Sequence, residues 1–96
     1  MAAGSRRLRV PPAVATVVRG LHPQIKRKLR SALKAVLEDP DCGKALKGEL
    51  TGLWSLRVGK FRVIYRRAPA HVIDLVAFGP RESIYEETHR LLAADK

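Results

Sequence analysis

The sequence predicts an α+β domain: a small curved, mostly antiparallel four-stranded sheet with an N-terminal helical hairpin and a C-terminal helix. Three observations support this. Apolar residues recur at helical spacing before Asp39, three β-type runs follow between residues 53 and 78, and helical spacing returns after Gly79. The expected order is β-α-α-β-β-β-α. The 96 residues fit a single domain spanning 1–96, with residues 1–5 expected to be disordered.

The N-terminal part predicts one short strand and one short helix. Ser5–Val10 is basic and compatible with β-structure, so it is either an edge strand or a loose arm. Pro11 and the proline after it suit a helix start, because proline is tolerated in the first turn. The helix is expected over Ala13–Arg19, with Gly20 as its C-cap.

A second helix is expected to start at Pro23 and to end before Asp39, because the proline that follows disfavours helical geometry. It has two distinct sides. One is a cationic stripe of Lys26, Arg30 and Lys34 at i, i+4 and i+8. The other is an apolar seam formed by Ile25, Leu29, Ala32, Leu33, Val36 and Leu37.

Cys42–Thr51 is expected to be a loop, and three strands are expected after it. These strands are Leu53–Val58, Phe61–Arg67 and Val72–Phe78. Only Gly59 and Lys60 separate the first two, and glycine in the first position fits a type II′ turn. The third strand is apolar on both faces, which is typical of a central strand covered on both sides.

The two-residue turn fixes the register of the hairpin. One face then carries three apolar pairs: Val58 with Phe61, Leu56 with Val63, and Trp54 with Tyr65. On the other face Arg57 opposes Arg62, and Ser55 opposes Ile64. The last helix is expected from Ile84 to about Ala93. Its inward side is formed by Ile84, Tyr85, Thr88, Leu91 and Leu92.

The charge balance points to polyanionic partners. Nineteen Lys and Arg against nine Asp and Glu give a formal net charge of +10, which favours nucleic acid first and an acidic protein second. The alternative is a highly solvated surface without a polyanion. Cys42 is the single cysteine, which excludes a disulfide framework and suits a reducing, cytoplasmic location. The sequence contains no run of about 18 apolar residues, so it predicts no membrane span.

Arg57 and Arg62 are the first candidates for chemistry. Like charges directly opposed across two strands destabilise the pair by up to about 1 kcal/mol. Two guanidinium forks match the geometry of a phosphate, so an oxyanion clamp is one interpretation. Two solvated arginines are the other. The pairing is expected only if the turn has two residues.

Arg81 precedes the last helix, where free backbone N–H groups make a natural anion site. It is expected to approach Arg62, unless it pairs with Glu82 or Glu86 instead. Tyr85 either packs in the core or transfers a proton near these cations. His89, one turn further on, is a weaker acid–base candidate.

Two segments resemble the RelE/ParE toxin superfamily of type II toxin–antitoxin systems. Residues 57–65 read Arg-Val-Gly-Lys-Phe-Arg-Val-Ile-Tyr, and residues 79–85 read Gly-Pro-Arg-Glu-Ser-Ile-Tyr. The resemblance implies the curved-sheet fold and an acidic antitoxin partner. RelE-like members cleave ribosome-bound mRNA without a metal, by attack of a ribose 2′-hydroxyl on the adjacent phosphate. By position, Arg62 and Arg81 match phosphate-stabilising arginines, Tyr85 matches the terminal tyrosine, and Arg57 matches a further basic position.

The chain departs from the RelE-like pattern on its first hairpin strand, where Leu53 and Ser55 occupy the places of two lysines. Lys44, Lys47 and Lys60 are the candidates to bind substrate phosphates instead, and the general base stays open. ParE-like relatives share the fold, lack the catalytic set and inhibit DNA gyrase.

The expected function is therefore a metal-independent mRNA endoribonuclease with no cofactor. Its expected partners are an acidic antitoxin, mRNA and the ribosome. A gyrase inhibitor and a catalytically inactive relative that binds nucleic acid and antitoxin are the alternatives.

Overall fold

A computed structural model describes residues 6–80 and 82–94. The first half contains one strand and two helices: β1 (Arg7–Arg9), α1 (Pro12–Arg19) and α2 (Pro23–Glu38). The second half contains four strands and a helix: β2 (Lys44–Ala45), β3 (Leu53–Val58), β4 (Phe61–Ala68), β5 (Val72–Pro80) and α3 (Ile84–Ala94). Two 3-10 turns, η2 (Pro40–Cys42) and η3 (Gly48–Leu50), flank β2.

The strands form one sheet in the order β1-β5-β4-β3-β2. β1 pairs with β5 in parallel, and the other neighbours are antiparallel. The α+β class, the helical hairpin and the C-terminal helix are confirmed. Of the two alternatives for Ser5–Val10, an edge strand and a loose arm, the structure shows the first: residues 7–9 form the edge strand β1.

The expected count of four strands is corrected to five within the described residues, because β2 lies inside the segment expected as a loop. Lys44 pairs with Ser55, and Ala45 pairs with Trp54. Two residues are too short to show the alternation that marks a strand in a sequence. β2 forms because the edge of β3 exposes unpaired backbone N–H and C=O groups. Lys44 and Ala45, which lie beside that edge, form hydrogen bonds with these groups.

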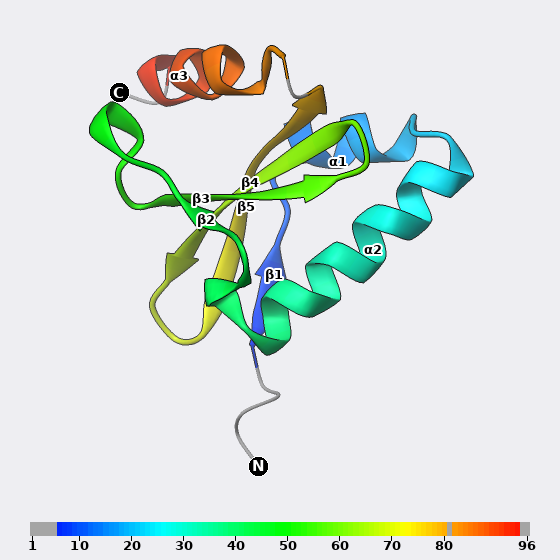
Figure 1. Cartoon of the computed structure of the whole chain (residues 1–96), viewed down its shortest axis with the longest axis horizontal. Helices are drawn as coiled ribbons and strands as arrows, with labels where there is room; N and C mark the ends of the chain where they lie inside the picture. Colours follow the sequence, from blue (N-terminus) through cyan, green and yellow to red (C-terminus); the bar gives the residue numbers. More distant parts are fainter. Residues whose placement is uncertain (1–5, 81, 95–96) are drawn as a thin grey trace.

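Helices cover both faces of the sheet, and each face has its own core (Figure 1). α1 and α2 pack on the face that carries Val63 and Tyr65, both fully buried. α3 packs on the opposite face, where Ile84 lies against Ile64 and Ala77 in the second cluster. The hairpin of β3 and β4 thus presents one face to α2 and the other to α3.

The predicted hairpin register is confirmed pair by pair, including Arg57 opposite Arg62 and Trp54 opposite Tyr65. Gly59 has a φ of 63°, whereas Lys60 is not among the residues with positive φ, which is the pattern of a type II′ turn. β4 and β5 run further than predicted, to Ala68 and Pro80, and a bulge interrupts their pairing between Ile64 and Tyr65.

The N-terminal strand is held at both its start and its end. The Arg6 guanidinium donates to the carbonyl oxygens of Leu37 and Glu38, at 2.9 and 3.2 Å, and so caps the last turn of α2. Arg9 forms a two-pronged ion pair with Asp74 of β5. Across the described ranges, the helices are too short or too polar to cross a lipid bilayer.

Candidate active site

Arg57 and Arg62 lie on the sheet face that carries α3, but their guanidinium groups point in different directions. Arg57 is exposed, and its Nε donates to the carbonyl oxygen of Gly59 at 3.3 Å, back toward the turn. Arg62 is half-buried and turns toward the centre of the sheet. Within the described ranges, neither arginine lies at ion-pair distance from a carboxylate. The two guanidinium groups thus point apart, and neither forms an ion pair with a carboxylate of the described residues.

Ser55 links Arg62 to Tyr85. Arg62 Nη1 donates to Ser55 Oγ at 3.1 Å, and the same oxygen lies 3.2 Å from the Tyr85 hydroxyl. Ser55 is 1% exposed, whereas Tyr85 is half-buried. Three elements therefore meet in one hydrogen-bonded chain, with β4 supplying the cation, β3 the bridging hydroxyl and α3 the phenol.

Arg62 also carries an unpaired donor. Its Nε is buried and has no hydrogen-bond partner among the described residues. Leaving a buried donor unsatisfied costs about 1–3 kcal/mol, and such groups are rare in folded proteins. The described chain therefore leaves this cationic N–H without an acceptor.

Gly79 explains how α3 comes so close to this cluster. It is the β5 residue paired with Arg62. A Cβ atom at this position would lie 3.2 Å from Cδ1 of Ile84, which is tighter than an ordinary contact. The missing side chain lets the first turn of α3 pack directly on the sheet. Ile84, 1% exposed, anchors that turn, and Tyr85 follows it above Ser55.

The three candidate lysines are all exposed, but they occupy different places. Lys44 is the β2 residue paired with Ser55, so its side chain leaves the sheet on the same face as the Arg62 cluster. Lys60 lies in the hairpin turn next to Arg57's end of the sheet. Lys47 lies beyond the end of β2, just before η3. Of the three lysines, Lys44 is thus the one paired directly with Ser55.

Arg81 lies outside the described residues, so its approach to Arg62 stays a prediction. One competing partner is engaged elsewhere, because Glu86 Oε1 lies 3.6 Å from Nη2 of Arg90. His89 is exposed, and its Nε2 lies 3.5 Å from a carboxylate oxygen of Glu49. The hydrogen bonds that start at Arg62 and pass through Ser55 therefore reach Tyr85 and not His89.

Tyr65 and Trp54, which the register places on the apolar face of the hairpin, pack in the core on that face. The Tyr65 hydroxyl donates to the carbonyl oxygen of Pro40 at 2.6 Å and accepts from the Gly43 N–H. Burial raises the pKa of Tyr65 to about 12, so this phenol stays protonated at neutral pH. Trp54 stacks on it with ring centroids 6.3 Å apart.

Two important residues gave weak signals in the sequence. In the sequence, Ser55 stands out as a departure from the RelE-like pattern and as the residue opposite Ile64, but a further signal could have found it: it is a small hydroxyl residue in the middle of a face otherwise made of apolar and cationic side chains. Asp74 stands inside the apolar run of β5 and is 5% exposed. A lone carboxylate in such a run indicates a buried ion pair, here with Arg9 and Arg66.

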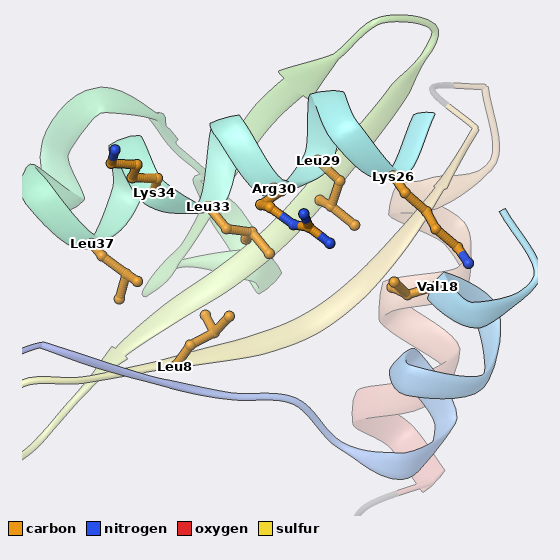
Figure 2. A pocket seen from close by; sticks show the side chains of 8 residues that line it. All are labelled: Leu8, Val18, Lys26, Leu29, Arg30, Leu33, Lys34 and Leu37. Atoms are coloured by element: carbon orange, nitrogen blue, oxygen red, sulfur yellow. The ribbon is translucent and has the colours of Figure 1, made fainter. Parts of the chain in front are cut away.

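A groove of about 400 Å³ lies on the other side of the molecule, between α2, α1 and β1. Figure 2 shows the apolar side chains of α2 above Leu8 and Val18, with cationic side chains beside them. The apolar lining is formed by Leu8, Val18, Leu29, Leu33 and Leu37. The predicted stripe of Lys26, Arg30 and Lys34 is therefore the charged part of this groove.

Comparisons with solved structures place the fold among known toxins. The toxin–antitoxin complex RelBE2 of Mycobacterium tuberculosis matches with a TM-score of 0.69 and 25% identity, covering 79% of this chain and 98% of the other. A mutant of the Escherichia coli toxin RelE in the free state matches with a TM-score of 0.73 and 21% identity, covering 94% and 96%. The YoeB-YefM complex of Staphylococcus aureus matches with a TM-score of 0.67 and 17% identity, covering 77% and 94%.

Two sequence comparisons were informative in different ways. The search of curated proteins found no match, whereas a family model agrees with the fold. The family model that describes the ParE-like toxin of the type II bacterial toxin–antitoxin system matches residues 8–89, which run from within β1 through strands β2 to β5 and into the first half of α3. The chain therefore belongs to the family of ParE-like toxins of type II toxin–antitoxin systems.

Proposed function

We propose that this toxin is a metal-independent mRNA endoribonuclease. A ribose 2′-hydroxyl attacks the adjacent phosphate, and the products carry a cyclic phosphate and a 5′-hydroxyl. The observation that supports this most is the hydrogen-bonded chain from Arg62 through Ser55 to Tyr85, next to Arg57 on the same face. It joins a cation that lacks a carboxylate partner in the described chain to a group able to transfer a proton.

Each residue has a role in this reaction. Negative charge gathers on the phosphorane oxygens in the transition state, and Arg62 and Arg81 stabilise it. Tyr85 assists the proton transfer. Four further cations bind phosphates of the substrate: Arg57, Lys60, Lys47 and Lys44. Because Lys44 is paired with Ser55, it is the one expected to contact the phosphate nearest to the scissile bond.

The substrate is expected to be ribosome-bound mRNA in the cytoplasm. The net charge of +10 favours association with a particle made largely of RNA, and such binding weakens as salt rises. The lone Cys42 is consistent with a reducing compartment.

Inhibition of DNA gyrase is the second candidate function. The observation that favours it is the family model itself, which describes a ParE-like toxin. An inhibitor of this kind needs an exposed contact surface and no chain of catalytic groups. A catalytically inactive relative is the third, and it is expected to bind nucleic acid without cutting it.

The proposed partner is an acidic antitoxin. Several structural neighbours were solved as toxin–antitoxin complexes, among them RelBE2 and YoeB-YefM. In this chain the groove beside α2 has an apolar floor and three cations, which complement an amphipathic segment with acidic residues on one side. We place the antitoxin there and expect a hetero-oligomer.

One experiment separates the candidate functions. Induced expression followed by primer extension on cellular mRNA should show discrete cleavages that are absent with Arg62→Ala. Purified toxin that has been treated with EDTA and then dialysed should cleave mRNA on ribosomes as fast as untreated toxin. Intact mRNA together with loss of DNA supercoiling would instead establish gyrase inhibition. Salt-sensitive RNA binding without either activity would identify an inactive relative.

A further inference from the structure

Ser55 lies at the centre of the candidate site and yet is closed to substrate. The residue is 1% exposed, and its hydroxyl faces Tyr85 of α3. Its oxygen contacts Arg62 on one side and Tyr85 on the other. A group buried to this extent does not touch an RNA phosphate, so any effect on the reaction passes through its two neighbours.

The donors and acceptors of this chain fit together in a definite order. Arg62 can only donate, so the Ser55 oxygen accepts from Nη1. A hydroxyl has two lone pairs and one proton, so Ser55 can also donate to the Tyr85 oxygen or accept from it. In both arrangements one small side chain fixes the direction of the guanidinium and that of the phenol.

Arg62 has few other constraints among the described residues. Its Nε has no hydrogen-bond partner and no carboxylate of the described residues pairs with it, so the bond from Nη1 to Ser55 is the polar contact that orients the guanidinium. Without that hydroxyl the guanidinium can take other rotamers. A displacement of about 1 Å in a catalytic group can cost about a hundredfold in rate.

We propose that Ser55 is a positioning residue that aims the Arg62 guanidinium and the Tyr85 phenol at the same phosphate. This inference rests on the proposed nuclease function. It adds a residue to the site and explains why β3 carries a small hydroxyl at the position paired with Lys44.

Ser55→Ala is the first test. We expect kcat for RNA cleavage to fall by about 10–100-fold, while KM changes by less than about threefold, because the substrate contacts themselves remain. Ser55→Thr and Ser55→Val form a matched pair that differs in little more than the hydroxyl. Threonine should retain at least about ten times the kcat of valine. Equal rates for the two would overturn the proposal, and the pair remains informative if Ser55→Ala folds poorly.

A double-mutant cycle with Tyr85→Phe tests the coupling. If Ser55 acts through Tyr85, removing the serine hydroxyl should cost less in the Tyr85→Phe background than in the wild type. Independent, fully additive losses would mean that Ser55 and Tyr85 do not act together, contrary to the proposal.

A third readout does not depend on cleavage. NMR signals of the Arg62 Nε and Nη groups should show a guanidinium that rotates slowly in the wild type and in Ser55→Thr, and faster in Ser55→Val. Absence of RNA cleavage by the wild-type toxin would refute the proposed function, whereas this spectrum would still report on Ser55. Identical Arg62 signals in all three proteins would refute the positioning role.

Discussion

Lys44 and Ser55 are directly paired across β2 and β3. The pairing places an exposed ammonium group on the same face as the buried hydroxyl that contacts Arg62 and Tyr85. β3 itself carries Leu53 and Ser55 where RelE-like relatives often carry lysines. On this face β3 itself carries one cation, Arg57. The neighbouring strand β2 adds a second, Lys44.

This pairing predicts a ranking among the lysines. Lys44→Ala should lower kcat/KM for RNA by about tenfold or more, because it removes a charge-assisted contact to a phosphate near the reacting one. Lys47→Ala removes the same charge beyond the end of β2 and should have a smaller effect. Steady-state cleavage at several salt concentrations measures both. A larger loss with Lys47→Ala would contradict the assignment of Lys44 to the centre of the site.

The second prediction concerns the shape of the Arg62 side chain. Arg62→Lys keeps the positive charge but replaces a planar fork with a single point of donation. We expect kcat to fall by about a hundredfold or more, as is typical when a donor to the developing charge is lost. Affinity for RNA should change little, since the net charge is the same.

Arg19→Lys is the control for this exchange, because Arg19 is an exposed residue at the end of α1, outside the site. It should cleave RNA at the wild-type rate. Activity in Arg62→Lys close to that of the control would show that only the charge at this position matters, and it would remove the main support for a fork-shaped phosphate clamp.

Much of this architecture could be predicted from the sequence, because local rules determined it. The Gly59-Lys60 turn set the register, and the register placed Arg62 opposite Arg57. β2 could not be predicted, since two residues form a strand only after the edge of β3 exists. The role of Ser55 also depended on a distant event, the docking of α3 on Gly79, which brings Tyr85 over the sheet.

The third prediction concerns acid stability. Hydrogen bonds from Arg9, supported by the charge of Arg66, hold the pKa of Asp74 below its usual value despite burial. A carboxyl whose folded pKa is depressed stabilises the fold fully above its unfolded pKa, near 3.8, and loses this contribution as the pH falls through the lower folded pKa. Asp74→Asn should therefore unfold at a lower urea concentration than the wild type at pH 7, and the difference should shrink below about pH 4.

Asp41→Asn is the matched control for Asp74→Asn. Asp41 also pairs with an arginine, Arg67, at 2.6 Å, but both side chains are exposed. Exposed pairs contribute about 0–1 kcal/mol, so this variant should shift the urea midpoint at pH 7 less than Asp74→Asn does. A gap between wild type and Asp74→Asn that persists unchanged to pH 2 would mean that the charge of Asp74 is not what stabilises the junction of β1 and β5.

The last prediction tests where the antitoxin binds. Arg30 lines the groove beside α2, whereas Arg27, on the same helix, is exposed and does not line it. Arg30→Glu should weaken binding of the purified acidic antitoxin by about tenfold more than Arg27→Glu, because only the first change places a like charge against the docked segment. The two variants have the same net charge, so long-range attraction is lowered equally. Calorimetric titrations at two salt concentrations measure the effect, and equal losses in both would locate the antitoxin outside this groove.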